Sequence, residues 1–417
     1  MMRAISARFT PFIVASFFLV TAGSAVAQTL TPAEEAEQAR VLELSEAKSR
    51  LAIYGWVETS VTGNFSSPED NQNFGRLFDD RSNEFVMNQA VITAERELEP
   101  KSGFDWGFKL QLLFGTDARY IHSLGMHYDE AGTGLYQGDI PEAFLSLHLP
   151  ILTEGGLDVT LGKFISLEGA ETVDPRTNAF YSHTYIFNFG IPANHTGALL
   201  TLHTTSWLDL MAGVTRGVNT SIDDNNDSPA FHGGIGLNLN DGKVVALAST
   251  HIGPETSGND SDLRYFNDIA ITWKITDKLT SITDINYTRD GGADADAYGV
   301  AQYLTYAIND TLTAAVRGEI WRDDKGFYVA QFAHPGDALR ALGGEPTIDP
   351  RTIGGARTTY GALTIGLNIK LPVPKPFTSL TIRPELRVDH AFDDTHLFND
   401  SSDNTMFTAA LDAILTF

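Results

Sequence analysis

The chain has 417 residues, 53 Asp plus Glu against 29 Lys plus Arg, a formal net charge of −24 and no cysteine. The acidic excess argues against nucleic-acid binding, because neutralising phosphates requires a basic surface. The lack of cysteine excludes disulfides, thiolate metal sites and cysteine nucleophiles. A mean hydropathy of −0.11 would, taken alone, suggest a soluble protein.

Residues 1–27 have the layout of a secretory signal peptide. Two arginines precede a mostly apolar stretch over residues 9–20, and the segment ends in Ala-Val-Ala at residues 25–27. Such a stretch is too short and wrongly flanked for a spanning helix, although an N-terminal anchor helix is the alternative. We expect export, which leaves 27 basic against 53 acidic groups and a net charge of −26.

Residues 28–50 predict a short periplasmic helical segment. Thr31 can serve as N-cap, Pro32 as the first helical residue and Glu34 as the partner in a capping box. The stretch up to Arg50 is rich in Ala, Glu, Leu and Lys. This helix could associate with copies of itself; a frayed, charged tail is the alternative.

From residue 51 onward, segments of about ten residues alternate apolar and polar positions, which is the period of a half-buried β-strand. In residues 378–390, Leu380 and Leu386 share one face, while Arg383 and Arg387 share the other. We count sixteen such segments, at roughly 51–64, 83–95, 104–114, 142–149, 157–164, 196–204, 207–216, 231–240, 243–252, 264–275, 278–289, 296–308, 311–322, 357–371, 378–390 and 405–417.

The connections between these segments alternate in length. Links of two residues, such as 205–206, alternate with longer ones, such as 165–195 and 323–356. A soluble sandwich mixes its connection lengths, whereas an outer-membrane barrel has short periplasmic turns and longer extracellular loops. The pattern predicts an all-β fold, an up-and-down antiparallel transmembrane β-barrel of about 16 strands over residues 51–417, with both termini periplasmic.

Aromatic residues and the last strand favour the same fold. Rings are expected at both membrane boundaries, and we place Trp207, Trp273, Tyr306 and Phe377 at the short-turn ends and Phe114, Tyr265, Tyr287 and Tyr360 at the loop ends. In the last segment, Phe407, Leu411 and the terminal Phe417 share one face. This strand resembles the signal read by the barrel assembly machinery.

A barrel of this size is too wide for its side chains to fill and leaves an aqueous channel. Opposed charges across a lumen orient dipolar solutes and filter ions. The alternative for each residue is a charge that is simply paired and solvated. The inward register predicts the pore-lining residues Lys109, Lys274, Asp284, Arg317, Glu319, Lys370, Arg383, Glu385 and Arg387.

Residues 165–195 are the best candidate for a constriction loop. The segment carries charged residues and then an aromatic run, as an inward-folded loop would; an ordinary external loop is the alternative. The predicted constriction residues are Glu168, Glu171, Asp174 and Arg176.

The same region carries a family resemblance. Residues 175–185, Pro-Arg-Thr-Asn-Ala-Phe-Tyr-Ser-His-Thr-Tyr, and residues 190–198, Gly-Ile-Pro-Ala-Asn-His-Thr-Gly-Ala, resemble the putative beta-barrel porin-2 family. The resemblance extends over most of residues 51–417. It implies a passive outer-membrane porin of poorly defined substrate, and it brings no established binding residues.

Metal and cofactor signals are weak, and we expect no cofactor. Loops 217–230, 253–263 and 391–404 contain no Lys or Arg, and their carboxylates could bind Ca²⁺ or Mg²⁺ and cross-link to lipopolysaccharide. Solvated acidic loops are the alternative. His122 and His127 share a long loop and could meet at a metal, although such a pair is more often incidental. The acidic loop residues are Asp223, Asp224, Asp227, Glu255, Asp260, Asp262, Asp393, Asp394, Asp400 and Asp403.

Together these patterns predict an outer-membrane porin that passes small hydrophilic solutes or ions, with a weak cation preference. By analogy with general porins we expect a homotrimer, with membrane lipid, lipopolysaccharide and the assembly machinery as partners. No zinc-protease, nucleophile-elbow or phosphate-loop motif is present, so no enzyme activity is expected. The alternatives are a plugged structural or adhesive barrel and a lipid-modifying barrel enzyme.

Overall fold

The structure is a computed structural model that describes residues 50–99, 103–126, 134–344 and 353–417. The signal peptide predicted for residues 1–27 and the helical segment predicted for residues 28–50 lie outside the described residues, except for Arg50. Both therefore stay predictions.

The described residues form sixteen barrel strands, a two-stranded sheet and short helical turns. The barrel strands are β1 (Leu51–Asn64), β2 (Phe85–Arg96), β3 (Asp105–Gly115), β4 (Gln137–Leu149), β5 (Leu157–Ile165), β6 (Asn194–Thr205), β7 (Leu208–Thr215), β8 (Ala230–Leu239), β9 (Val244–Pro254), β10 (Leu263–Lys274), β11 (Leu279–Asp290), β12 (Ala295–Asn309), β13 (Leu312–Asp323), β16 (Thr358–Leu371), β17 (Ser379–Ala391) and β18 (Thr405–Thr416). The small sheet pairs β14 (Ala330–Gln331) with β15 (Ile353–Gly354), and the helical elements are α2 (Ala118–Ile121), α3 (Asp337–Leu342), the 3₁₀ turn η1 (Pro175–Thr177) and the π turn η2 (Ile186–Gly190).

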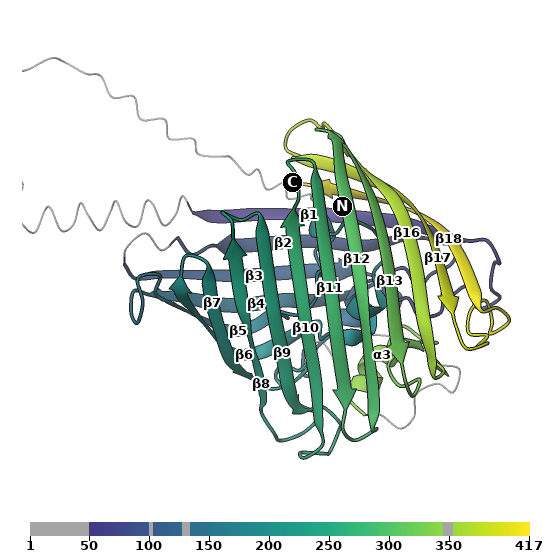
Figure 1. Ribbon diagram of the computed structural model, residues 1–417, viewed down its shortest axis with the longest axis horizontal. Helices are drawn as coiled ribbons and strands as arrows, with labels where there is room; N and C mark the ends of the chain where they lie inside the picture. The colour runs from purple at the N-terminus through teal and green to yellow at the C-terminus, as the bar shows by residue number, and fades with distance from the viewer. Residues whose placement is uncertain (1–49, 100–102, 127–133, 345–352) are drawn as a thin grey trace, which may run out of the picture. The chain divides into compact units, whose positions relative to one another are not determined.

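The barrel closes between its first and last strands. Each strand pairs antiparallel with its neighbours, and β1 pairs with β18 (Figure 1). The seam continues past β18, where Gly55 and Phe417 exchange two backbone hydrogen bonds of 3.1 and 3.0 Å. The predicted sixteen-stranded barrel is confirmed; β4 begins at Gln137, five residues before the predicted start. Closure gives every strand two partners, which a spanning sheet requires because lipid offers no hydrogen bonds.

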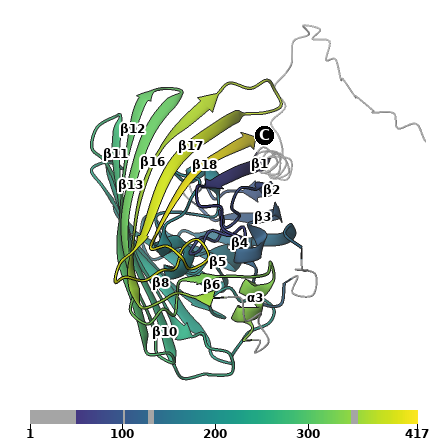
Figure 2. The same cartoon turned by 90° about the vertical axis from the view of Figure 1, so that its right-hand side faces the viewer.

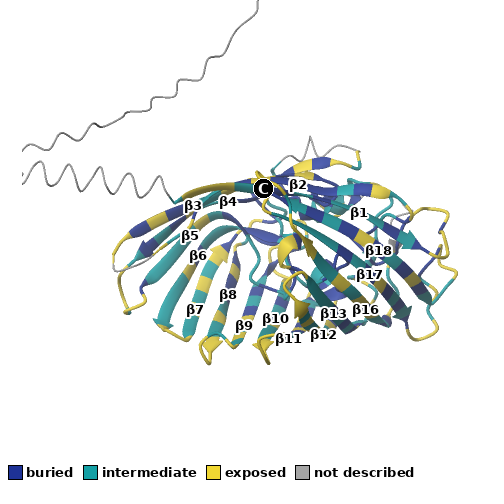
Figure 3. Ribbon diagram, turned by 90° about the horizontal axis from the view of Figure 1, so that it is seen from above, coloured by how far each residue is buried: buried dark blue, intermediate teal, exposed yellow. Residues whose placement is uncertain are grey.

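Each strand has an apolar outer face and a polar inner face. On β18, Phe407 and Leu411 are exposed, whereas Thr408 and Asp412 are buried. Successive side chains of a strand point to opposite faces, so the sequence period of two becomes two surfaces. Figure 3 shows the resulting bands of buried and exposed residues along the strands.

One rim of the barrel carries links of eight residues or fewer, and the other carries the long links together with the shorter links 255–262 and 291–294. The turns at 206–207, 240–243 and 310–311 lie at one rim, and long links such as 324–357 lie at the other (Figures 1 and 2). This arrangement follows from antiparallel pairing of consecutive strands, and it confirms the predicted up-and-down topology.

One aromatic position was predicted wrongly. Trp207, Trp273 and Tyr306 are exposed near the short-turn rim, as expected for a membrane-boundary ring. Tyr360, however, is fully buried and stacks on Tyr185 with ring centroids 4.9 Å apart. Its place in β16 has the parity of the buried Thr358 and Thr364, so the ring points inward.

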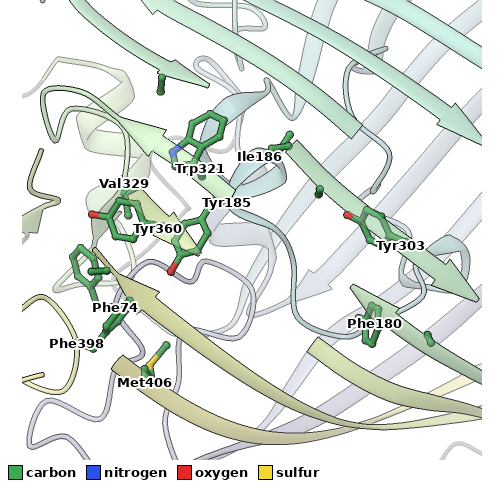
Figure 4. Packing of buried hydrophobic residues seen from close by; sticks show 14 residues of the cluster. Phe74, Phe180, Tyr185, Ile186, Tyr303, Trp321, Val329, Tyr360, Phe398 and Met406 are labelled. Atoms are coloured by element: carbon green, nitrogen blue, oxygen red, sulfur yellow. The ribbon is translucent and has the colours of Figure 1, made fainter. Parts of the chain in front are cut away.

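The main hydrophobic core lies inside the barrel (Figure 4). It joins inward side chains of the strands to side chains from the long links. No helix among the residues described here is long and apolar enough to cross a membrane. The larger core side chains are Phe74, Phe180, Tyr185, Ile186, Tyr303, Trp321, Val329, Tyr360, Phe398 and Met406.

Candidate functional site

Residues 166–193, which link β5 to β6 and are called the inner loop below, cross the barrel interior. Many of their hydrogen-bond partners lie on strands around β13, which stands eight places from β5 in the sixteen-stranded ring, and others lie on β1 and β2. The turn η1 begins at Pro175, which fits a first helical position, and the Asp174 carboxylate accepts the Arg176 N–H at 3.0 Å. The predicted constriction loop therefore folds into the barrel.

Strand β17 holds the backbone of the inner loop through three charged side chains. Arg383 donates to the carbonyls of Pro175 and Asn178 at 2.8 and 2.9 Å. Glu385 accepts the N–H groups of Tyr181 and Ser182, and Arg387 donates to the His183 carbonyl. These bonds satisfy loop groups that would otherwise be buried without partners, which is costly in a dry interior. All three charged side chains are buried.

Strands β12 and β13 bind the same loop around Glu171. The Glu171 carboxylate accepts from Arg317 at 2.7 Å and from the Tyr303 hydroxyl at 2.9 Å. Burial alone would raise the pKa of Glu171, but Arg317 and the hydrogen bonds from His183 and Thr184 hold it below its usual range. Glu171 is therefore a buried carboxylate held by an ion pair and by hydrogen bonds.

Further anchors come from strands β10, β11 and β16. Asp268 accepts the Gly169 N–H at 3.0 Å, and Asp284 accepts the Ala170 N–H at 3.1 Å. Asn368 donates to the Ala179 carbonyl at 2.9 Å. Because the bonds come from a wide arc of the wall, the inner loop has one defined position across the lumen.

The structure places the nine predicted pore-lining residues in two groups. Six are buried on the inner wall and bond to the inner loop directly: Asp284, Arg317, Glu319, Arg383, Glu385 and Arg387. Lys109 pairs with Glu142 at 2.5 Å, while Lys274 and Lys370 are exposed near the short-turn ends of their strands.

Of the four predicted constriction residues, two are buried and two are partly exposed. Glu168 and Glu171 are buried in the inner loop, whereas Asp174 and Arg176 form an ion pair of 2.6 Å with partly exposed side chains. The Arg176 guanidinium also lies 4.0 Å from the ring centroid of Trp56 on β1, a cation–π contact. Arg176 is thus the constriction residue best placed to meet a passing solute.

Two cavities lie on opposite sides of the inner loop. One of about 380 Å³ is lined by Arg176, Lys370 and the short-turn residues Asp310 and Thr311. The other, of about 310 Å³, is lined by Asn188 and Phe189 of the inner loop and by residues of the long links. The inner loop therefore separates a short-turn vestibule from a long-loop vestibule, and both carry polar and charged side chains.

Sequence reasoning missed a second inward link, residues 65–84. Arg76 of this link forms buried ion pairs with Asp79 and with Asp389 of β17. The available signal was apolar: Phe74, Leu77 and Phe78 stand in a link otherwise rich in Asn and Asp. A solvent-exposed loop would not bury such an apolar cluster. Here these side chains pack inside the barrel.

The histidine pair proposed from the sequence stays a prediction, because only His122 lies among the described residues. His122 is buried, and its Nε2 lies 2.7 Å from the side-chain oxygen of Gln137. His127 lies outside the described residues. In the acidic links, the Asp227 N–H donates to Asp260 at 2.8 Å, and the cation sites expected there stay a prediction.

Glu255 in one of these links predicts a pH effect on stability. Burial raises the pKa of Glu255 to about 7, against the hydrogen bond from the Val218 N–H, which lowers it. Between pH 4.5 and about 7, the Glu255 carboxyl is deprotonated in the unfolded chain but still protonated in the folded one. The free energy of unfolding therefore falls as pH rises through this window and is constant above it.

Glu255→Gln keeps the acceptor for Val218 and removes the charge. We expect wild type to lose about 1–3 kcal/mol more stability than the variant between pH 5 and pH 8. Urea midpoints of the barrel in detergent micelles at both pH values measure this difference. Equal pH dependence of the two proteins would contradict the assignment.

The same architecture occurs in solved outer-membrane channels. The outer membrane channel DcaP of Acinetobacter baumannii is 14% identical with a TM-score of 0.51, over 88% of this chain and 97% of that one. The anion-selective porin from Comamonas acidovorans is 9% identical with a TM-score of 0.55, over 88% and 99%. Salmonella typhi OmpF, in complex with daunomycin, is 10% identical with a TM-score of 0.57, over 88% and 97%. At these identities the likeness shows the fold alone.

The sequence comparison identifies the family. No curated protein matches the chain. The family described as "Putative beta-barrel porin-2, OmpL-like" matches residues 50–417, which confirms the resemblance found at residues 175–198. The chain belongs to this family and is an outer-membrane porin.

Proposed function

We propose that the protein is a passive pore for small hydrophilic solutes or ions, narrowed by the inner loop, with no catalytic step and no cofactor. The observation that carries this proposal is the pair of polar cavities separated by that loop. A solute entering at the long-loop rim would pass the inner loop near Arg176 and reach the short-turn vestibule. Such a path requires no energy input.

A weak cation preference is part of the proposal. The chain has a net charge of −24, and an acidic field concentrates cations at a channel mouth. A reversal potential measured in planar bilayers across a salt gradient should show permeability to cations slightly above that to anions. Clear anion selectivity would contradict the preference and leave the pore itself intact.

Arg176→Glu should strengthen cation preference. The substitution changes the charge by two units at an exposed position that lines the cavity on the short-turn side of the inner loop, so the cation-to-anion permeability ratio should rise about two- to fivefold at moderate salt. Arg216→Glu, at an exposed residue of an outer link, is the matched control and should change the ratio little. The same reversal-potential assay measures both, and equal effects would contradict the position given to Arg176.

Export and assembly are proposed on the sequence patterns. The signal at residues 1–27 would direct export, and the C-terminal strand would be read by the barrel assembly machinery. Outer-membrane lipid and lipopolysaccharide would surround the apolar face, and a homotrimer is proposed by analogy with general porins. Calcium or magnesium bridges from the acidic links to lipopolysaccharide are the only metal role in this scheme.

A plugged structural or adhesive barrel is the second candidate. A second apolar cluster supports it, since side chains from the links 65–84 and 116–136 pack there against the inner loop. Among them are Leu77, Phe78, Ala118, Ile121 and Val173. A plugged barrel would carry no stable ion current, so conductance separates the two candidates.

A further inference from the structure

Three histidines lie close together on the inner side of the barrel wall. They are next to the first residues of the inner loop, 166–168, which are called its root below. His195 lies on β6, His232 on β8 and His251 on β9, and all three are fully buried. His232 and His251 are opposite residues of neighbouring strands, and the rings of His195 and His232 have centroids 4.3 Å apart. Buried imidazoles need hydrogen-bond partners or another compensating interaction, and nothing in the permeation path uses these.

The first imidazole is oriented as a metal ligand would be. His195 Nδ1 lies 3.0 Å from the Gly217 carbonyl oxygen, which can only accept, so Nδ1 carries the hydrogen. Nε2 then presents a lone pair, and it faces the Ser166 hydroxyl at 3.1 Å. A histidine that donates one nitrogen to a backbone carbonyl and offers the other is the usual arrangement at a metal.

The remaining polar groups lack hydrogen-bond partners. The Ser166 hydroxyl donates to one oxygen of Glu168, so its single proton is not available to His195. The other Glu168 oxygen and both ring nitrogens of His232 are buried and make no hydrogen bond. Glu168 Oε1 and His232 Nδ1 lie 3.6 Å apart. With the His232 hydrogen on Nε2, the lone pairs of His232 Nδ1, Glu168 Oε1 and His195 Nε2 lie close together, which is an arrangement that a cation would satisfy.

We propose that Glu168, His195 and His232 bind a divalent transition-metal ion, and that the ion ties the root of the inner loop to the barrel wall. The three ligand atoms lie within 4.8 Å of one another. In a tetrahedral zinc site the ligand atoms are separated by about 3.3 Å, close to the separation of the Glu168 and His232 atoms. Small side-chain rotations would bring His195 to the same distance from the ion as the other two ligands.

The ligand set selects the class of ion. Two imidazole nitrogens and one carboxylate oxygen suit zinc and its first-row neighbours, whereas calcium and magnesium prefer oxygen ligands throughout. His251 supports the site without joining it: its ring stacks on His195 with centroids 4.5 Å apart, and its Nε2 lies 3.2 Å from the Thr215 hydroxyl.

The position of the site gives the ion a structural role. Glu168 stands three residues beyond β5, at the start of the inner loop, and His232 is on β8, which is not a neighbour of β5. An ion between them would link two parts of the wall through the loop. This inference does not depend on what crosses the pore.

Metal content tests the site directly. The full chain is unfolded in urea and refolded into detergent micelles with ZnCl₂. After excess metal is removed, elemental mass spectrometry measures the zinc content per chain. Wild type should retain about one zinc per chain, and Glu168→Gln and His232→Ala below about a fifth of that. His390→Ala, on the outer face of β17 and bonded to Thr405, is the control and should bind as wild type does.

A second readout is thermal stability. A strong chelator present during refolding should lower the unfolding midpoint of wild type and His390→Ala by several degrees and leave Glu168→Gln unchanged. Glu168→Gln preserves the size of the side chain and the hydrogen bond from Ser166. If His232→Ala does not fold, the zinc content of Glu168→Gln alone therefore tests the site. The proposal is overturned if refolded wild type retains no zinc, or if Glu168→Gln retains as much as wild type.

Discussion

Replacing Arg317 by Met should release the inner loop and lower folding stability by about 3–5 kcal/mol. Arg317 donates to the Glu171 carboxylate, to the Ser182 carbonyl and to the Ser182 hydroxyl. Methionine has a similar length and no charge, so the buried Glu171 would lose its main partner and would either stay ionised at a desolvation cost or take up a proton. An unpaired carboxylate is better solvated by water in the cavities beside the loop, and the loop should move with it.

Urea midpoints in micelles and single-channel conductance in planar bilayers measure the two effects. The variant should unfold earlier, and its channels should be larger and noisier than those of wild type. Arg322→Met is the matched control, since this arginine of the same strand pairs with the exposed Asp393 and an exposed pair contributes about 0–1 kcal/mol. If Arg317→Met conducts and unfolds like Arg322→Met, the inner loop is not held by this pair.

Gly55→Val should prevent closure of the barrel. A Cβ at Gly55 would lie 2.1 Å from the Val91 carbonyl oxygen of β2 and 2.6 Å from the ring of the terminal Phe417. The first contact is with backbone and cannot be relieved by a rotamer change, so β1 would have to leave one of its partners. The expected destabilisation is at least about 3 kcal/mol, at the upper end of overpacking effects.

Gly63→Val controls for the residue type. Gly63 lies on the same strand and has the same parity, but a Cβ there would meet nothing closer than 3.5 Å, an ordinary contact. The fraction of heat-resistant folded barrel on denaturing gels should fall sharply for Gly55→Val and stay near wild type for Gly63→Val. Equal yields would show that the seam between β1, β2 and Phe417 is looser than described.

The strands were predictable because their signal is local. Each barrel strand needs only an apolar residue at every second position, as on β18, and the antiparallel order then follows from the lengths of the links. Tyr360 is a position at which local patterns gave the wrong prediction. Its ring suggested the membrane boundary, but strand parity points it inward at Tyr185, a partner that no local pattern reveals.

The inner loop was only half predictable. Its aromatic run indicated an inward fold, and the parity of β13 and β17 placed their arginines inside the barrel. That Arg317, Arg383 and Arg387 bind the loop rather than face water depends on pairs up to 208 residues apart in sequence, such as Arg383 with Pro175. The same limit hid the histidine group, whose members come together only through barrel register.

The central claim is that the barrel is an open pore despite the links packed inside it, and single-channel conductance of the wild-type protein in planar bilayers tests it most directly. The account predicts stable, stepwise openings whose current is proportional to voltage, because polar cavities border the inner loop on the short-turn side and on the long-loop side. Membranes that contain fully folded protein and show no steps above the leak would contradict it and would establish the plugged barrel instead.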